Sequence, residues 1–362
     1  MKTRITFVGE DYWTAHLASA FNERFPEGVA CVAIRLRGSR LAIGRAVWHL
    51  MRDDVIVRVG FPPPTLPEYE AVLYADRQGL REELKRALFL TAIGRALRRV
   101  VLFTRLDGSG RRRFVVDWAQ RSSRWLRSTR SDFMYWIGSD VLYAADVVDN
   151  APSGLRFLAR FSPFRHVTGV HRLTEELEKL GVKAETVPYP GRIPQPPTQI
   201  APMPERMTVL TYVPDARRDF YGLPALMRVA EVLADVDFLV MGGTDGGLAD
   251  SPANMSFLGF VDDPRPLYDR SSVVIRHVSH DGAGYSMVEG LLHGRQVIYT
   301  YEVPHTIHVP FGDVEGLTEA LGALREQHMS GGIPLNKAGR EWALVEYDAD
   351  RRFRSLLGVL LG

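Results

Sequence analysis

The sequence has a single cysteine, Cys31, which excludes an internal disulfide framework and any zinc site that needs several cysteine ligands. It also lacks an apolar run of the roughly 20 residues that a membrane-spanning helix requires. Residues 1–9 have the pattern of a buried strand, without the charged and apolar regions of a secretory signal peptide. From these absences we predict a cytoplasmic protein.

Net charge is small, because 45 Lys and Arg residues are nearly balanced by 43 Asp and Glu residues. The charges are unevenly spread, however, since the segment from Arg81 to Arg130 holds fourteen basic and four acidic residues. Part of this segment has the pattern of an amphipathic helix at a membrane surface, although a helix packed on its own domain has the same pattern. We expect the segment to face an anionic membrane or a lipid-linked diphosphate and not nucleic acid, because no RNA-binding or zinc-finger motif accompanies it.

A length of 362 residues, 46% of them apolar, suits two globular domains. In the first half, strand and helix patterns alternate at a spacing that predicts parallel βαβ units. The strand patterns are "RITFVG", "GVACVAIRL", "DDVIVRVGF", "DFMYWIGSDVLYA" and "FRHVTGV", and the helix patterns are "TAHLASAF", "LAIGRAVWHLM" and "HRLTEELEKLGV".

A proline-rich stretch then interrupts the alternation. Seven prolines between positions 188 and 204 exclude a regular helix or strand there and indicate an interdomain linker. The alternation resumes after it, which predicts an α/β protein with two Rossmann-like, doubly wound domains facing a cleft. The predicted parts are an N-terminal domain over 1–190 with a basic helical insertion near 78–130, a linker over 191–205, a C-terminal domain over 206–340, and C-terminal helices over 341–362 that pack back on the first domain.

A glycine-rich loop joins a strand pattern to a helix pattern in "SSVVIRHVSHDGAGYSMVEGLLHG", residues 271–294. Ligands of open parallel sheets bind beyond the carboxyl ends of the strands, and glycines let them approach the N–H groups of a helix start. Asp281 and Glu289 lie eight positions apart, on either side of the glycines. Turn geometry and compensation of the helix dipole are alternative explanations for these glycines and acids.

Residues 255–300 resemble the donor-binding half of retaining glycosyltransferases with the GT-B fold, of the family 4-like group. The resemblance rests on "FLGFV", "LY", the two acids separated by seven residues, the small-residue turn in "LLHGRQVIYT" and, further on, "FGDVEGLTEALGAL". It is good over roughly 205–330 and patchy over 1–190. It implies a nucleotide-diphosphate sugar as donor, with no cofactor and no metal.

The resemblance also implies roles for the matching residues. Glu289 is expected to hold the donor ribose, a task that suits a carboxylate because it accepts two hydrogen bonds from a diol. Asp281 stands where the family usually has Glu and is expected to contact the transferred sugar. Backbone groups of the glycine loop would face the sugar and diphosphate, and those after an earlier strand would read the base. These positions are Gly282, Ala283, Gly284, Tyr285, Phe260 and Val261.

The chain departs from the family at the cations that neutralise the leaving diphosphate. With Gly222 as the anchor of the alignment, Tyr221 occupies the position of the family's lysine. Arg217, Arg218 and Arg276 are candidate substitutes, because a guanidinium can chelate a phosphate with two hydrogen bonds. Arg217 and Arg218 fit a solvated loop equally well. Arg276 follows an apolar run and needs a partner, and a phosphate is one.

Four other polar residues have candidate roles. Asp140, in "YWIGSD", either orients an acceptor hydroxyl or caps the turn that follows it. His280, beside the glycine loop, is a candidate hydrogen-bond donor. The ten histidines show no metal-ligand spacing, and Asp262 and Asp263 fit helix capping better than a metal site.

Together these features predict a metal-independent, retaining hexosyltransferase. Its acceptor is expected to be a glycan or a lipid-linked glycan of polysaccharide or cell-envelope synthesis, and a peripheral location at the inner membrane face would suit a lipid-linked one. The alternative is a degenerate subunit of a glycosyltransferase complex that binds a nucleotide sugar or a glycan. A sugar-nucleotide epimerase would share the two-domain architecture but not the acid pattern, and a nucleic-acid role has only the basic segment in its favour.

Overall fold

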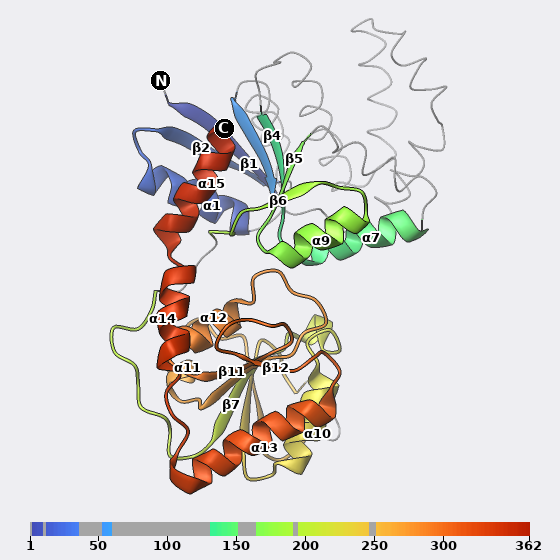
Figure 1. Cartoon of the computed structure of the whole chain (residues 1–362), viewed down its shortest axis with the longest axis vertical. Helices are drawn as coiled ribbons and strands as arrows, with labels where there is room; N and C mark the ends of the chain where they lie inside the picture. Colours follow the sequence, from blue (N-terminus) through green and yellow to red (C-terminus); the bar gives the residue numbers. More distant parts are fainter. Residues whose placement is uncertain are drawn as a thin grey trace, which may run out of the picture. The chain divides into compact units, whose positions relative to one another are not determined.

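The computed structural model describes residues 2–9, 12–35, 53–59, 131–150, 164–190, 195–245 and 251–362. The chain forms two compact units, one of Met1–Arg192 with Ala349–Gly362 and one of Ile193–Asp348 (Figure 1). The predicted helix in "LAIGRAVWHLM" and the basic insertion near 78–130 lie outside the described residues. Within the described part of the chain, no helix is long and apolar enough to cross a bilayer.

The first unit contains a six-stranded sheet in the order β2-β1-β3-β4-β5-β6, in which all neighbouring strands are parallel. Its strands are β1 (Thr3–Gly9), β2 (Val29–Arg35), β3 (Val55–Val59), β4 (Ser131–Trp136), β5 (Arg165–Thr168) and β6 (Ala184–Thr186). Its described helices are α1 (Tyr12–Arg24), α7 (Ser139–Asn150), α9 (His171–Lys179) and α15 (Ala349–Leu361).

Alternating strand residues give this sheet two buried faces. On one face, Met134 and Trp136 of β4 pack with α7 and α9. On the other, Phe7 of β1 stacks on Phe21 of α1, with ring centroids 5.5 Å apart. The predicted strands are confirmed. In "DFMYWIGSDVLYA" the strand ends at Trp136, shortly before the polar residues Ser139 and Asp140, and α7 begins at Ser139.

The second unit contains another six-stranded sheet, in the order β12-β11-β10-β7-β8-β9, again with parallel neighbours. Its strands are β7 (Thr208–Tyr212), β8 (Asp237–Met241), β9 (Met255–Gly259), β10 (Val273–Arg276), β11 (Gln296–Tyr299) and β12 (Ile307–His308). Its helices are the short 3-10 helix η1 (Asp215–Arg217), α10 (Leu223–Val232), α11 (Arg265–Asp269), α12 (Tyr285–Leu292), α13 (Val314–Gly331) and α14 (Lys337–Glu346).

Helices cover both faces of the second sheet, as expected of a doubly wound unit. Val273 and Ile275 of β10 point into a core shared with α10 and α13. Val274, between them, points into a second core shared with α12 and α14. Both faces of the strand are therefore apolar, which is why "VVI" reads as a continuous apolar run and not as an alternation.

The C-terminal helices divide between the two units. The break between them lies at Tyr347 and Asp348, because α14 ends at Glu346 and α15 begins at Ala349. Only α15 belongs to the first unit, where it lies beside α1 (Figure 1), whereas α14 packs against α12 in the second unit. The predicted return to the first domain from residue 341 is therefore wrong for α14 and begins at Ala349.

Candidate functional site

The candidate site lies where the strand order of the second sheet reverses. From β7 the chain proceeds to β8 and β9 on one side, and then to β10 and onward on the other. Ligands of doubly wound sheets bind at such a switch point, beyond the carboxyl ends of the two central strands. Tyr212 ends β7 and Arg276 ends β10.

A glycine-rich loop leads from β10 into α12 at this edge. Gly284, the residue before the helix, has a φ of 44°, in the left-handed region that favours glycine. A Cβ there would lie 2.9 Å from the Tyr299 hydroxyl, so the loop passes too close to β11 for any side chain. No side chain caps the start of α12 at Gly284, and a helix N-terminus favours an anion.

Asp281 and Arg276 form a buried ion pair in this loop. Arg276 donates from Nη2 to Asp281 Oδ1 at 2.9 Å and from Nε to Oδ2, and the two side chains are 12% and 8% exposed. Burial disfavours the charge on Asp281, but Arg276 outweighs it, so the pKa of Asp281 stays below its ordinary value. Arg276 was expected to need a partner, and within the protein Asp281 is one; phosphate binding by Arg276 stays a prediction.

Two further groups donate hydrogen bonds to Asp281. The Tyr299 hydroxyl donates to Oδ2 at 3.1 Å, and the Gly282 N–H donates to Oδ1 at 2.9 Å. Burial, followed by the Asp281 charge, raises the pKa of Tyr299 well above its ordinary value, so this hydroxyl remains a donor. Sequence reasoning missed Tyr299, although it ends the strand that follows α12.

Glu289 is half-buried on the second turn of α12 and accepts a hydrogen bond from the Tyr268 hydroxyl. Tyr268 is 1% exposed, and burial together with Glu289 raises the pKa of its hydroxyl well above the ordinary value. The hydroxyl therefore acts as a donor, and it orients the Glu289 carboxylate through Oε2. Tyr268 is the tyrosine of the "LY" segment in the sequence, but sequence reasoning assigned it no role.

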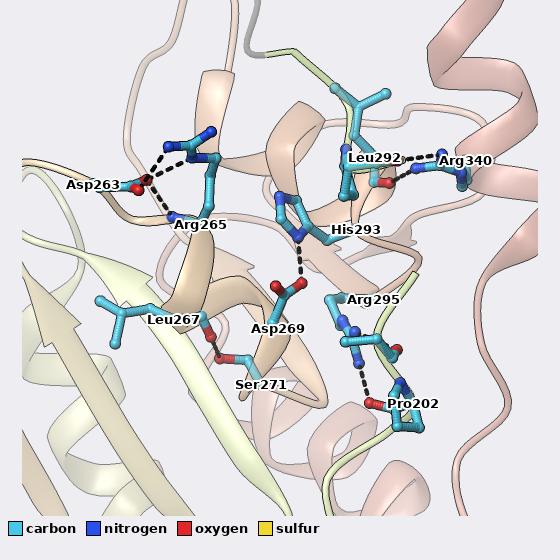
Figure 2. A network of polar contacts seen from close by, with 12 residues as sticks. Pro202, Asp263, Arg265, Leu267, Asp269, Ser271, Leu292, His293, Arg295 and Arg340 are labelled. Atoms are coloured by element: carbon cyan, nitrogen blue, oxygen red, sulfur yellow. Dashed lines mark hydrogen bonds and ion pairs between the residues drawn. The ribbon is translucent and has the colours of Figure 1, made fainter. Parts of the chain in front are cut away.

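Polar contacts hold α11, which carries Tyr268, in place (Figure 2). Asp263 accepts the Arg265 N–H at 3.2 Å and binds its guanidinium at 2.7 and 2.8 Å, which agrees with the predicted capping role. At the other end of α11, Asp269 lies 2.8 Å from His293 Nδ1. The His293 ring also packs beside the Tyr268 ring, with centroids 5.2 Å apart.

Arg217 and Arg218, the other predicted phosphate ligands, lie in the segment between β7 and α10. Arg218 donates from Nη2 to Asp215 at 2.6 Å and to the Thr244 carbonyl at 2.8 Å. Arg217 places its guanidinium 3.7 Å from the ring centroid of Phe220. Arg276 contacts the glycine-rich loop through Asp281 and the first turn of α12 through Ser286.

Tyr221, at the position of the expected lysine, joins this cluster through its ring. The guanidinium carbon of Arg276 lies 5.5 Å from the Tyr221 ring centroid, and the Tyr212 ring packs edge-on against it at 5.6 Å. Gly222, which follows, has a φ of 67°, and a Cβ there would lie 2.7 Å from the His277 carbonyl oxygen. The backbone before α10 therefore passes directly over the end of β10.

The remaining predicted donor-site residues differ in exposure. Phe260, after β9, is 85% exposed, whereas Val261 packs against the core on the α12 side of the sheet. His280 is buried, and Ala283 and Tyr285 are half-buried in the loop and the first turn of α12. Ser286, which sequence reasoning did not single out, lies 3.4 Å from Arg276 Nη1.

Asp140 lies in the first unit, in the first turn of α7. Its carboxylate accepts hydrogen bonds from the N–H groups of Ile137 (3.0 Å), Gly138 (2.7 Å) and Val141 (3.1 Å). This is the arrangement that the capping alternative predicts. A role toward an acceptor hydroxyl stays a prediction. Among the described residues of both units, no group of three or more His, Cys, Asp or Glu side chains is placed to hold a metal ion.

Comparison with solved structures identifies the architecture. Anabaena HepE in complex with UDP and glucose superposes with a TM-score of 0.64 at 12% identity, over 99% of this chain and 100% of that one. Sucrose-phosphate synthase from Thermosynechococcus elongatus gives 0.62 at 12% identity, over 99% and 98% of the two chains. The two parallel six-stranded sheets, with their helices, are therefore the two Rossmann-like domains of the GT-B fold.

A third similar structure is a mutant of S. aureus TarM in complex with fondaparinux, α-GlcNAc-glycerol and UDP. It gives a TM-score of 0.51 at 12% identity, over 67% of this chain and 53% of that one. The chain thus spans about half the length of TarM. No protein-family model and no curated protein sequence matches the chain.

Proposed function

We propose that this chain, which has the GT-B fold, is a glycosyltransferase that uses a nucleotide-diphosphate sugar as its donor. The observation that carries the proposal is the grouping of Arg276, Glu289 and the uncapped start of α12 at the switch point of the second sheet. A diphosphate needs N–H donors and a cation, and a ribose needs a carboxylate. The similar structures of TarM and HepE are complexes with UDP, and that of HepE also holds glucose, which agrees with a donor of this class.

In this proposal the residues divide the donor between them. The first N–H groups of α12 and the guanidinium of Arg276 bind the diphosphate and stabilise its growing charge as the bond to the sugar breaks. Glu289 binds the ribose hydroxyls, and the backbone near Phe260 and Val261 binds the base. Transfer with retention, and without a metal, follows from the family resemblance of the sequence.

The acceptor is proposed to be a glycan or a lipid-linked glycan of polysaccharide or cell-envelope synthesis. The support is the basic composition of the segment from Arg81 to Arg130, which suits an anionic membrane face or a diphosphate. That segment lies outside the described residues, so its role, and a peripheral location at the inner membrane face, rest on composition.

A second candidate function is a subunit that binds a nucleotide sugar without transferring it. Tyr221 favours this candidate, because a neutral ring stands where the family resemblance predicts a lysine. The two candidates differ in turnover: the enzyme transfers the sugar or slowly hydrolyses the donor, and the binding subunit does neither.

The donor site is tested with UDP-, GDP- and ADP-glucose by calorimetry, on the wild type and on Glu289→Gln. We expect one nucleotide sugar to bind the wild type and the substitution to weaken it at least roughly tenfold, because hydrogen bonds to a charged group are worth about 1.5–3 kcal/mol. Glu319→Gln, on the exposed side of α13, is the matched control and should bind normally. Equal affinity in the wild type and Glu289→Gln would remove the assignment.

A further inference from the structure

We propose that Asp281 does not read the transferred sugar but is a positioning residue that holds Arg276 against the donor diphosphate. This inference rests on the proposed function, because it concerns the same donor site. It departs from the role that the family resemblance implies for the first acid of the motif. The contacts of the two side chains carry the argument.

The acceptor capacity of Asp281 is occupied by the protein. A carboxylate offers about four lone-pair sites, two on each oxygen. Oδ1 accepts from Arg276 Nη2 and from the Gly282 N–H, and Oδ2 accepts from Arg276 Nε and from the Tyr299 hydroxyl. A sugar hydroxyl could bind only by displacing one of these donors. Displacement would leave a buried donor unpaired, at a cost comparable to the hydrogen bond gained.

The close packing of the loop prevents Asp281 from moving toward a ligand. Its side chain is 8% exposed, and a Cβ at Gly284 would lie 3.4 Å from Oδ2. Aspartate is one methylene shorter than the glutamate that the resemblance predicts at this position. The shorter Asp281 side chain is held by Arg276 at the end of β10 and by Tyr299 at the end of β11, so it stays beside Arg276.

Arg276, in contrast, keeps hydrogen-bonding capacity. A guanidinium has five N–H donors. Two go to Asp281, a third points at Ser286 Oγ from 3.4 Å, and within the part of the chain that the structure describes the other two have no acceptor. Ser286 is the second residue of α12, so the guanidinium lies beside the helix start where the diphosphate is proposed to bind.

The surroundings restrict the guanidinium to this direction. The Tyr221 ring lies 5.5 Å from it, and Asp281 holds its Nε and Nη2 edge. Because Asp281 balances its charge, Arg276 binds phosphate by directed N–H groups more than by net charge. Because the guanidinium of Arg276 is already oriented, its side chain loses little entropy when a phosphate binds.

The two roles of Asp281 predict different ligand dependence. Substitution of a residue that contacts the sugar lowers the affinity for the nucleotide sugar and leaves the affinity for the nucleoside diphosphate unchanged. Substitution of a residue that acts through Arg276 lowers both of these affinities equally. The affinity for the nucleoside, which lacks the phosphates, does not change. The ratio of affinities for the sugar nucleotide and the diphosphate therefore separates them.

The experiment measures the affinity of Asp281→Asn for a nucleotide sugar, its nucleoside diphosphate and its nucleoside, which are UDP-glucose, UDP and uridine for a uracil donor. We expect the affinities for UDP-glucose and UDP to fall together, by roughly tenfold, which is the effect of losing a hydrogen bond to a charged group. Uridine should bind as it does to the wild type. In an Arg276→Met background, Asp281→Asn should have no further effect on UDP.

Two controls keep the inference testable. Asp235→Asn, which breaks the exposed pair with Arg325 at 2.7 Å in the same unit, should change none of the three affinities. Because a broken buried pair can unfold a domain, the double variant Arg276→Met, Asp281→Leu replaces both charges with apolar groups. This double variant should bind UDP no more tightly than uridine, and the ratio of its affinities for UDP-glucose and UDP should equal that of the wild type.

The outcomes are separable. If Asp281→Asn lowers only the affinity for UDP-glucose, Asp281 contacts the sugar. If it lowers the affinity for uridine as much as that for UDP, its role is purely structural. Either result overturns the inference. Failure of the wild type to bind any nucleoside diphosphate would instead overturn the proposed function.

Discussion

At the scale of single residues, Glu289 depends on one buried hydroxyl for its orientation. Tyr268 donates to it from α11, and the Tyr268 ring packs beside His293 at 5.2 Å. The tyrosine lies 21 positions before the acid, so the pair joins two elements. If Glu289 binds the donor ribose, Tyr268 determines where the second carboxylate oxygen points.

Tyr268→Phe removes this hydroxyl and keeps the ring. We expect it to weaken binding of the donor nucleotide roughly tenfold, because a hydrogen bond to a charged group is worth about 1.5–3 kcal/mol. Calorimetry with the nucleoside diphosphate measures the effect.

The control uses the 2′,3′-dideoxy form of the same nucleotide. It lacks the hydroxyls that Glu289 is proposed to bind, so the wild type and Tyr268→Phe should bind it equally. A tenfold loss for the dideoxy nucleotide as well would mean that Tyr268 acts on the fold of the unit and not on ribose recognition.

At the scale of elements, the proline-rich linker is held by two arginines of the second unit (Figure 2). Arg295, with no exposed surface, donates to the carbonyls of Ala201 at 2.6 Å and Pro202 at 3.1 Å. Arg340 of α14 donates to the Pro197 carbonyl at 2.8 Å and to the Leu292 carbonyl at the end of α12. Prolines supply carbonyls but no N–H groups, which suits a segment held by donors from outside.

Arg340→Ala should release the first part of this linker. We expect faster cleavage of the native protein by thermolysin before Ile200, because the segment loses a contact that holds it on the domain. Mass spectrometry of a digestion time course locates and times the cut.

Arg325→Ala is the matched control for that experiment. It also removes an arginine from a helix of the second unit, but this arginine pairs with Asp235 at the surface. Exposed pairs contribute little to stability, so the cleavage rate should stay at the wild-type value. Equal cleavage of the Arg340→Ala variant and the wild type would contradict a linker held by α14.

At the scale of the whole molecule, the chain leaves the first unit after Arg192 and returns to it at Ala349. The returning helix α15 docks through Phe353, which meets the Phe21 ring edge-on at 5.0 Å. Arg24 of α1 lies 4.4 Å from the Phe353 ring centroid, and Arg352 donates to the Tyr189 carbonyl at 3.3 Å. The last helix of the chain is thus part of the core of the first unit.

Phe353→Ala should therefore destabilise the first unit by about 3–5 kcal/mol, the usual cost of removing a buried phenylalanine. The second unit should keep its stability, since α15 belongs to the other core. Hydrogen exchange measured by mass spectrometry reports the two units separately.

Leu361→Ala, on the same helix but half exposed, is the control and should change exchange in neither unit by much. Loss of protection in α10 or α13 of the Phe353→Ala variant would show that the two units do not unfold separately.

The candidate site was predicted from the sequence in its position but not in its contacts. The order of strand, glycine loop and helix around Asp281 follows from neighbouring residues and is confirmed. The ion pair with Arg276 was not predicted, because each residue alone fits a ligand contact as well as an internal one. Tyr299 was missed because its hydroxyl reaches Asp281 only through the pairing of β10 with β11.

The sequence by itself determined the type and order of the elements, the two parallel sheets and the edge that carries the candidate site. These features depend on periodicities of two and 3.6 residues and on glycine and proline, which act locally. Only the tertiary structure decided that Arg276 is held by Asp281, that Tyr268 supports Glu289, and that α14 and α15 belong to different units. The physical reason is that these contacts join segments whose distance in space is set by the packing of the sheets and helices, which no local pattern encodes.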